Sequence, residues 1–594
     1  MKRPRLSMVG LLAGFLGFIS IYAYPTPANF DGPAELPRVL VHSAITDTPA
    51  PGKVITVHAG ENLQAAIDRA SCGDRVELQA GATFTGAFRF SQKPCDDAHW
   101  IIVRTAAPES ELPAEGTRLK PCFAGVASLP GRPDFHCTSI QNVMAKIEFP
   151  VTQGNGPLIF REGANHYRFI GLEITRTARG RVSALASADQ NAQANHLIFD
   201  RVWMHGDPQA ETTRAIALTG MSYAAVVDSF FTDFHCTAMT GSCTDAQVIS
   251  CGGGNAPSGP FKIFDNFLES SGENILFGGG PATNTPTDFE IRGNHFFKPL
   301  TWRPGEPGFV AGESGKPFIV KNLFELKNAQ RVLLEGNILE NSWGGFSQKG
   351  FAIVLTPKNQ GGRCPTCRVT DVTIRYNLIL NVGSVFLISN GADAPGQYSS
   401  AGERYSIHDM VAQNVRGEQY DGSGLFALIA AASPPLRDVR IEHVSAFVPR
   451  AAFSIMNTTG RFENFHIENN LLSTGELGLV SSGGGQQNCA EQVGSRSQGR
   501  SLDGAVVFGN CFTNSSFAHN LLIGEGDWPK GNTSAKDGHS AGLHESGQMQ
   551  RLYVLCAHKD GDCKKASPAL HAASDGKDIG ADIEKLDQML ANVW

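Results

Sequence analysis

The feature that most constrains this chain is a phrase that recurs from about residue 160 onward. Each copy has an alternating apolar strand, one turn residue that is most often Asn, and a second short apolar run. A base period just under thirty residues with variable insertions is typical of a solenoid whose surface loops differ in length. The turn positions are Gly171, Arg201, Ser229, Asn266, Asn294, Asn337, Asn377, Asn414, His443, Asn470 and Asn520.

The alternation before each turn residue predicts a strand with one face in a continuous core. Phe289 and Ile291 share a face in one copy, and Val332 and Leu334 do so in the next. Asn tolerates a left-handed backbone, and stacked Asn side chains can hydrogen-bond from one rung to the next. An antiparallel sandwich is the alternative, but it would show two-residue hairpin loops and no fixed repeat. We therefore predict an all-β, single-stranded parallel β-helix.

The composition agrees with many short strands joined by tight turns. The chain has 65 Gly and 32 Pro, with 41% hydrophobic and 18% charged residues. This mixture is too apolar for a disordered chain and too rich in turn residues for a helical one. The formal net charge is -7 and no basic stripe follows the sequence. We therefore expect no nucleic-acid partner.

The N-terminus has the pattern of an export signal. Lys2, Arg3 and Arg5 precede an apolar run from Met8 to Ala23. The run is short for a membrane span, which needs about 20 residues. An uncleaved anchor is the alternative, and it is the only membrane contact we expect. The chain is predicted to be secreted, periplasmic or attached to the cell surface.

Thirteen cysteines fit an oxidising compartment. They are spaced for short local disulfides, with one thiol left over in the group of three. The Cys364–Cys367 pair has the spacing of a redox motif, but no helix pattern follows it, so a loop disulfide is expected. The local groups are Cys72 and Cys95; Cys122 and Cys137; Cys236, Cys243 and Cys251; Cys364 and Cys367; Cys489 and Cys511; Cys556 and Cys563.

Both ends of the solenoid have sequences that could cover the last rungs. Leu63, Ala66, Ile67 and Ala70 form one apolar helical stripe near the N-terminus. A second stripe, a candidate lid, is made by Ile583, Leu586, Leu590 and Val593. The predicted organisation is 1–24 signal peptide or anchor, 25–52 Pro-rich linker, 53–105 N-terminal cap and first coils, 106–158 loop insertion, 159–530 parallel β-helix, and 531–594 C-terminal coil and capping tail.

Three segments carry a family resemblance. LQAAIDRASCGDRVELQAGATF resembles the entry helix and first turn of the pectate-lyase-like right-handed β-helix superfamily. Ser567-Pro568-Ala569, followed by Asp578-Ile579-Gly580-Ala581, is similar to the tail of many bacterial members. A third segment, HFFKPLTWR followed by KNLFELKNAQRVLLEGNILENSW, resembles a group of exported bacterial β-helix proteins of unassigned activity. The resemblance implies a right-handed solenoid over residues 53 to 585, and a polysaccharide-active protein.

The repeat register singles out a column of polar residues. Positions four after the turn residue should stack up the outside with rungs about 4.8 Å apart. Nearby loops add Glu273, Trp302, Arg303 and Trp343. The column holds Thr175, His205, Asp233, Ser270, Lys298, Asn341 and Asn381.

These side chains suggest a groove for an acidic glycan. A lyase that works by β-elimination needs a cation that neutralises the uronate carboxylate, a base and an acid. Our candidate catalytic residues are Lys298, Arg303 and His205, with His205 paired to Asp233. The candidate substrate-binding residues are Trp302, Trp343 and Asn341, and Asp233 and Glu273 are candidate ligands for Ca²⁺, the one cofactor we consider.

Other interpretations remain open at this point. Charged residues outside a solenoid are often only solvated, and the two Trp side chains could simply cover loops. Val202-Trp203-Met204-His205 resembles the VWIDH segment of pectate lyases, but Met204 replaces its Asp. The related hydrolases use an Asp pair at a strand end and a Gly-His-Gly segment, and neither is found here, since Asp96-Asp97 lies beside Cys95 in a loop of the cap region. The alternative to a lyase is a non-catalytic protein that binds glycan at a cell surface.

Overall fold

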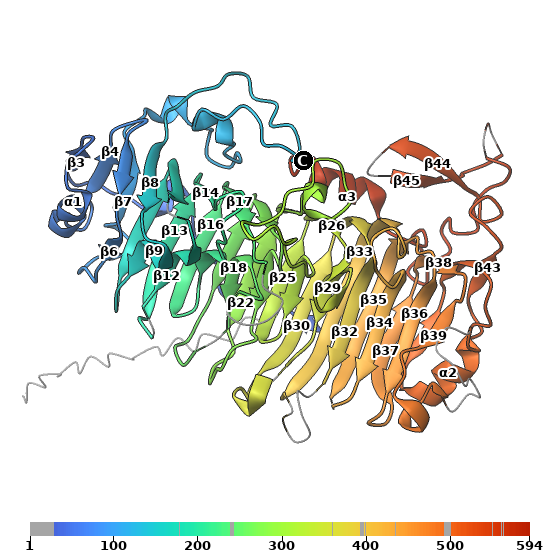
Figure 1. The fold of residues 1–594 in the computed structure, drawn as a ribbon. Coiled ribbons are helices and arrows are strands. Elements are labelled where there is room, and N and C mark those ends of the chain that lie inside the picture. The colour runs from blue at the N-terminus through green and yellow to red at the C-terminus, as the bar shows by residue number, and fades with distance from the viewer. Residues whose placement is uncertain are drawn as a thin grey trace, which may run out of the picture.

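The computed structural model is a right-handed parallel β-helix, as predicted (Figure 1). It describes residues 29–594 except 178, 190, 238–242, 253, 359, 392–396, 398, 434, 492–500, 549–550, 560 and 562. The predicted export signal therefore lies outside the described residues. Within them, no helix is both long and apolar enough to cross a membrane.

Each turn of the solenoid contributes a strand to three parallel sheets, which we name A, B and C. Sheets A and B meet in the long strands β33 and β35, whose first halves lie in sheet A and second halves in sheet B. Sheet A contains β3 (Val54–Val57), β4 (Arg75–Leu78), β7 (Ile101–Thr105), β10 (Asn165–Ile170), β13 (Ala194–Asp200), β16 (Met221–Val227), β19 (Phe261–Phe264), β22 (Thr287–Arg292), β25 (Ala329–Glu335), β30 (Arg368–Arg375), β33 (Ala401–Val415), β35 (Leu436–Ala446), β37 (Phe462–Glu468), β40 (Phe512–Thr513) and β41 (Ser516–Ala518).

Sheets B and C complete each coil. Sheet B contains β5 (Thr83–Thr85), β8 (Ala145–Phe149), β11 (Leu172–Arg176), β14 (Trp203–His205), β17 (Phe230–Phe234), β20 (Phe267–Ser270), β23 (His295–Phe297), β26 (Ile338–Ser342), β31 (Leu378–Val382), β38 (Leu471–Gly475), β42 (Leu521–Gly524) and β43 (Thr533–Ala535). Sheet C contains β6 (Phe88–Phe90), β9 (Gln153–Phe160), β12 (Arg181–Ala188), β15 (Arg214–Ala217), β18 (Gln247–Cys251), β21 (Ile275–Phe277), β24 (Phe324–Leu326), β29 (Phe351–Leu355), β32 (Ser384–Asn390), β34 (Leu425–Ala431), β36 (Ala451–Asn457) and β39 (Leu479–Ser481).

The turn between sheets A and B is stabilised by the predicted Asn ladder. Asn266 Nδ2 donates to Asn294 Oδ1 at 2.9 Å, Asn294 to Asn337 at 3.0 Å, and Asn337 to Asn377 at 2.9 Å. All four side chains are buried, so each amide replaces hydrogen bonds that water would otherwise make. In these four rungs the left-handed residue is the one before the Asn and not the Asn itself, whereas the turn residue Asn414 is left-handed as expected, with φ 53°. Asp265, which precedes Asn266, has φ 52°.

Two helices bury apolar faces in the main core near opposite ends of the solenoid. Helix α1 (Leu63–Arg69) buries Leu63, Ala66 and Ile67 near the N-terminal end, and α2 (Gly504–Cys511) lies at the C-terminal end (Figure 1). The predicted lid, α3 (Ile583–Leu590), forms as a helix but does not cover the last rung. It packs on the outer face of sheet B midway along the solenoid, because strands β26, β31 and β33 present apolar side chains there.

Residues 29–52, expected to be a linker, instead pack along the outside of sheet A. They contain β1 (Phe30–Asp31), β2 (Ala34–Glu35) and a short 3₁₀ turn, Ile45–Asp47. The backbone N–H groups of Glu35 and Arg38 donate to Asp371 and Asp288. Both acceptors have a left-handed backbone, Asp288 in β22 and Asp371 in β30, and strand β25 lies between these two strands. We call residues 29–52 the strap.

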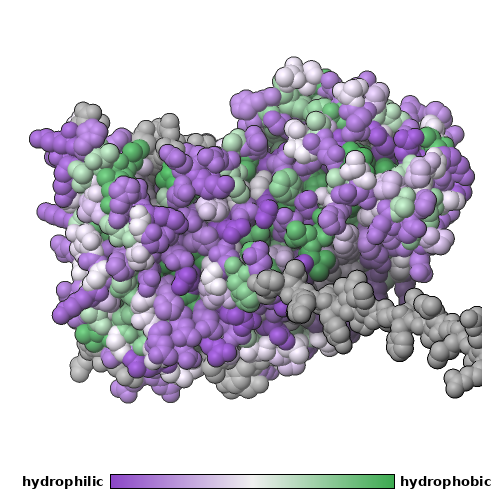
Figure 2. All heavy atoms as spheres, turned by 180° about the vertical axis from the view of Figure 1, so that it is seen from behind, coloured by the Kyte–Doolittle hydropathy of each residue, from purple (hydrophilic) through white to green (hydrophobic). Residues whose placement is uncertain are grey.

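Six disulfides join the expected local cysteine pairs, and Cys251 is the free, buried thiol. Cys364–Cys367 closes a loop of sequence separation 3. Short antiparallel pairs β27 (Gly344–Gly345) with β28 (Gln348–Lys349), and β44 (Leu543–Gln548) with β45 (Arg551–Leu555), project from the coils. The face seen from behind is polar over much of its area, with scattered apolar side chains (Figure 2).

Candidate functional site

Three segments cover much of the outer face of sheet B. The insertion after β7 packs Leu119, Phe135 and Met144 on aromatic side chains of β14, β17, β20 and β23. Helix α3 covers the middle rungs, and C-terminal side chains such as Leu543, Ala569 and Ile579 cover the last ones. The insertion is shorter than predicted, because residues 145–149 and 153–160 already belong to β8 and β9.

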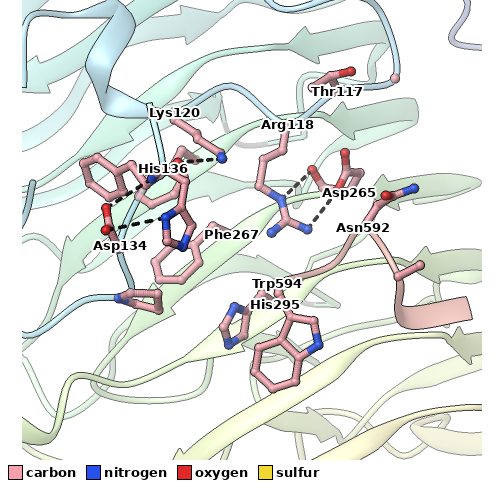
Figure 3. A pocket seen from close by; sticks show the side chains of 15 residues that line it. Thr117, Arg118, Lys120, Asp134, His136, Asp265, Phe267, His295, Asn592 and Trp594 are labelled. Carbon is pink, nitrogen blue, oxygen red and sulfur yellow. Dashed lines mark hydrogen bonds and ion pairs between the residues drawn. The ribbon is translucent and has the colours of Figure 1, made fainter. Parts of the chain in front are cut away.

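A pocket of about 440 Å³ lies between the insertion and the C-terminal residues (Figure 3). Its lining combines cationic, imidazole and aromatic side chains on the outer face of a parallel sheet. The lining residues are Gly116, Thr117, Arg118, Lys120, Pro133, Asp134, Phe135, His136, Phe230, Asp265, Phe267, His295, Ala591, Asn592 and Trp594. We call this the sheet B pocket.

Arg118 joins the walls of the pocket. Its Nη2 donates to Asp265 Oδ1 at 2.8 Å and to the Gly293 carbonyl at 2.9 Å, and its Nη1 donates to the Val593 carbonyl at 2.8 Å. Burial lowers the pKa of Arg118, and Asp265 opposes that shift. The same burial raises the pKa of Asp265, against the effect of Arg118. The pair therefore fixes the C-terminal residues against the sheet.

Lys120 and His136 lie on the insertion side of the pocket (Figure 3). Lys120 Nζ donates to the Phe135 carbonyl at 2.6 Å. Partial burial, together with the positive charge of Arg118, lowers the pKa of Lys120. His136 is exposed, and its Nδ1 lies 3.5 Å from Asp134 Oδ2. The pocket thus places an amine with a lowered pKa beside an accessible imidazole.

The floor and the far wall are aromatic. Phe230 and Phe267 stack with their ring centroids 4.4 Å apart, and Phe135 packs edge-on to Phe230. His295 Nε2 lies 2.9 Å from Glu340 Oε2, and Trp594 contacts the His295 ring at 5.9 Å between centroids. Trp594 is 38% exposed, so part of its ring is open to a ligand. Aromatic faces of this kind pack well on the apolar faces of sugars.

The predicted polar column does not form a solvent-facing groove. Thr175, Asp233, Ser270, Lys298 and Asn341 are all buried. Strand β23 ends before Lys298, and the backbone turns left-handed at Asp233 and Asn341. The residue paired in register with His205 is Thr232, not Asp233. A fixed count of four from the turn residue therefore does not stay on one face.

Lys298 is enclosed in the wall of the solenoid. Its Nζ donates to the carbonyls of Ser270 and Gly272 and to Asn274 Oδ1. Burial lowers the pKa of Lys298 to about 7, although the charges of Glu273 and Glu269 favour its protonated form. Because the side chain is fully buried, it cannot contact a glycan in this conformation.

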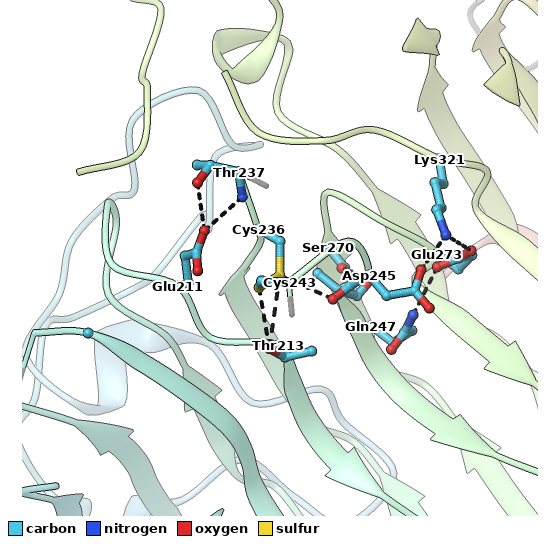
Figure 4. Close-up of a disulfide and its surroundings, with 12 residues drawn as sticks. Glu211, Thr213, Cys236, Thr237, Cys243, Asp245, Gln247, Ser270, Glu273 and Lys321 are labelled. Carbon is cyan, nitrogen blue, oxygen red and sulfur yellow. Dashed lines mark hydrogen bonds and ion pairs between the residues drawn. A yellow bond between two sulfur atoms is a disulfide. The ribbon is translucent and has the colours of Figure 1, made fainter. Parts of the chain in front are cut away.

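The predicted calcium ligands bind protein cations instead. Asp233 Oδ1 accepts from Arg132 Nη2 at 2.6 Å, and Arg132 also pairs with Glu269. Glu273 lies 3.3 Å from Lys321 Nζ and accepts from Gln247 at 2.9 Å (Figure 4). In the part of the chain that the structure describes, neither belongs to a group of three converging metal-ligand atoms.

Trp302 and Trp343 are buried among Phe318, Val320 and Tyr420 rather than open to solvent. Arg132 lies over the Trp302 ring, 5.5 Å from its centroid. Arg303 pairs with Glu306 and Asp421, each at 3.1 Å. Asn341 donates to the Lys298 carbonyl. These residues hold the loops of the middle rungs together, and none of them lines the sheet B pocket.

His205 is part-exposed and has a carboxylate partner, but that partner is Glu173. His205 Nε2 lies 3.0 Å from Glu173 Oε1, and Lys146 Nζ lies 3.0 Å from the same oxygen. Burial raises the pKa of Glu173, but hydrogen bonding to His205 and the charge of Lys146 outweigh it and lower the pKa overall. The His205 ring stacks on Trp203 at 4.1 Å.

The comparisons with known proteins find similarity only among solved structures. No protein-family model and no curated protein matches the chain. The alginate lyase AlyGC of family PL6 is 12% identical with a TM-score of 0.41, covering 89% of this chain and 58% of that chain. The pectate lyase Pel9A is 11% identical with a TM-score of 0.35, covering 90% and 97%. The family 28 exopolygalacturonase of Yersinia enterocolitica is 10% identical with a TM-score of 0.33, covering 80% and 75%.

These solved structures are right-handed parallel β-helices. At this level of likeness they do not bear on the activity of the chain. The pocket residues Arg118, Lys120, His136 and Trp594 were missed because they lie in the insertion and the C-terminal tail, outside the repeat. Nothing in the local sequence indicates that the two segments meet.

Proposed function

We propose that this protein binds an acidic polysaccharide in the sheet B pocket and cleaves it by β-elimination. The observation that carries the proposal is the meeting of Arg118, Lys120 and His136 with the exposed Trp594 over one parallel sheet. β-Elimination needs a cation near the uronate carboxylate, a base for the adjacent proton and an acid for the leaving oxygen. The pocket offers one residue for each of these roles.

Lys120 is the proposed base. Its pKa is lowered, so a larger fraction of the amine is neutral near neutral pH than for an exposed lysine. Arg118 would hold the substrate carboxylate electrostatically, and His136 would protonate the leaving oxygen. Trp594 would support a sugar ring at the end of the pocket. Because the pocket offers cationic side chains for a carboxylate, uronate polymers are the first substrates to test.

The test is incubation with pectate, alginate and glycosaminoglycans, each with and without Ca²⁺. We expect an unsaturated, ultraviolet-absorbing product from one of them. Lys120→Ala should reduce kcat by at least 100-fold with a smaller change in KM. Lys316→Ala is the matched control, because Lys316 is exposed and distant from the pocket lining.

The pH profile gives a second readout. The activity should rise with pH as Lys120 loses its proton, with a midpoint below the ordinary lysine pKa of 10.5. Binding of a glycan without any product would instead support a non-catalytic glycan-binding protein. If none of these polymers is bound or cleaved, the proposal as a whole is contradicted.

A further inference from the structure

A cluster on the outer face of sheet A lies well away from the sheet B pocket. Asp97, His166 and His196 bring one ligand atom each to within 4.8 Å of one another. His166 is in β10, His196 is in β13 on the next rung, and Asp97 is in the loop after Cys95. The three residues are separated by 69 and 30 positions in the sequence.

The backbone aims both imidazoles outward. His166 has φ 58° and His196 has φ 54°, and each is skipped in the pairing of β10 with β13. The two histidines therefore stand opposite each other in neighbouring strands with the same left-handed backbone, so their side chains lie on the same side. The rings stack 4.3 Å apart with an interplanar angle of 6°, and Tyr223 of the following rung continues the stack. The Cys72–Cys95 disulfide holds the loop that carries Asp97.

The separations are close to those around a tetrahedral metal ion. The distance from Asp97 Oδ1 to His166 Nε2 is 3.3 Å, and the distance from Asp97 Oδ1 to His196 Nε2 is 3.7 Å. Zinc bonds to nitrogen and oxygen of about 2.0–2.1 Å place tetrahedral ligand atoms roughly 3.3–3.4 Å apart. A small opening of the stacked rings would direct both nitrogens at one ion.

The hydrogen bonds determine which nitrogen of His196 is free. Asn195 Nδ2 donates to the Gln193 carbonyl, so its Oδ1 faces His196 Nδ1 at 2.7 Å and accepts the proton. In the neutral ring, Nε2 then presents a lone pair to the carboxylate of Asp97. Two acceptors facing each other are stabilised by a cation between them. An Nδ1–H that donates to a fixed oxygen is also the usual support of a metal-bound histidine.

We propose that Asp97, His166 and His196 bind a divalent transition metal, with zinc as the preferred ion. Two imidazoles and one carboxylate suit zinc better than Ca²⁺ or Mg²⁺, which prefer oxygen ligands. Asp97 is 85% exposed at its side chain, so the fourth position is open to water. The ion would join the Cys95 loop to two rungs of sheet A.

The test loads the full chain with ZnCl₂, removes free metal by desalting and measures bound zinc by mass spectrometry. We expect one zinc per chain and a higher Tm for the loaded protein. Asp97→Asn and His196→Gln should each weaken zinc binding at least tenfold, as measured by calorimetry. Asp97→Asn is informative even if other variants misfold, because its exposed side chain makes no core contact.

His571→Gln is the matched control, since His571 forms an exposed His–Asp pair with Asp578 and has no third ligand among the residues that the structure describes. This variant should keep wild-type zinc content. Wild-type protein without stoichiometric zinc, or equal affinity in Asp97→Asn, would overturn the proposal. The result does not depend on glycan cleavage, so it stands or fails separately from the proposed lyase activity.

Discussion

Lys298 shows how one residue can satisfy a sequence pattern and still have another role. The repeat places it four residues after Asn294, where an outward side chain was expected. Strand β23 ends at Phe297, and the following residue instead supplies three protons to oxygens of the neighbouring coil. An ammonium group matches three acceptors, whereas burial favours the neutral amine. The balance of the two brings the pKa to about 7.

This pKa predicts a pH-dependent stability. Between pH 7 and the ordinary lysine pKa of 10.5, the unfolded chain binds the proton and the folded chain has largely lost it. The free energy of unfolding should therefore rise with pH, by up to about 1.4 kcal/mol per unit. Denaturant unfolding of wild type and Lys298→Met between pH 7 and 9 measures the difference. Lys316→Met, at an exposed position, should show no such difference. If the difference in the free energy of unfolding between wild type and Lys298→Met does not change with pH, the buried amine is not neutral.

At the scale of elements, the repeat predicted the fold but not its exact register. The apolar alternation recurs in eleven copies of one phrase, and Asn occupies the turn position in seven of them, so the repeat itself reveals both features. The strap is different, because it has no repeat of its own. It is held by side chains at left-handed positions of the strands beneath it, such as Asp288 and Asp371. Six prolines between residues 25 and 52 suggested a linker, yet proline is equally suited to an extended segment that pairs through side chains.

The strap predicts a second pH dependence, opposite in sign to that of Lys298. His408 lies between Asp31 of the strap, at 3.1 Å, and Asp409, at 2.7 Å. Burial lowers the pKa of His408, but the two carboxylates outweigh it and raise the pKa to about 9. The folded state therefore binds more protons between pH 6.5 and 9, and this contribution to stability is lost as the pH rises through 9.

Asp31→Asn should remove much of that stabilisation. Below pH 6.5 we expect the free energy of unfolding to fall by about 1–3 kcal/mol, because a charge-assisted hydrogen bond is lost. Thermal unfolding measured from pH 5 to pH 9 should show that the difference in Tm between Asp31→Asn and wild type is smaller at pH 9 than at pH 5. Asp47→Asn, in an exposed part of the same strap, is the control. An equal loss at every pH would mean that His408 does not titrate with the strap.

At the scale of the whole molecule, function depends on contacts between distant segments. The sequence predicts the solenoid, its disulfides and the two helices with an apolar stripe, because each is encoded within a few tens of residues. It does not predict that Arg118 meets Val593, or that Asp97 meets His196, since no local pattern records those distances. The catalytic and metal sites proposed here both belong to this second class. Helix α3 shows the difference. The apolar stripe predicts that the helix forms, but it does not predict which surface of the solenoid the helix covers.

The docking of that helix can be tested directly. Leu586 and Leu590 are fully buried against Ile338, Leu378 and Val411, although α3 lies outside the main core. Leu590→Ala should therefore cost about 2–5 kcal/mol in the free energy of local opening, while the unfolding of the solenoid changes little. Limited proteolysis should then cut more quickly at Lys585. Because Trp594 follows the helix and lines the sheet B pocket, glycan affinity should fall in parallel. Glu584→Ala, at an exposed position of the same helix, should change neither readout. Faster cleavage without loss of glycan affinity would place the ligand elsewhere on the solenoid.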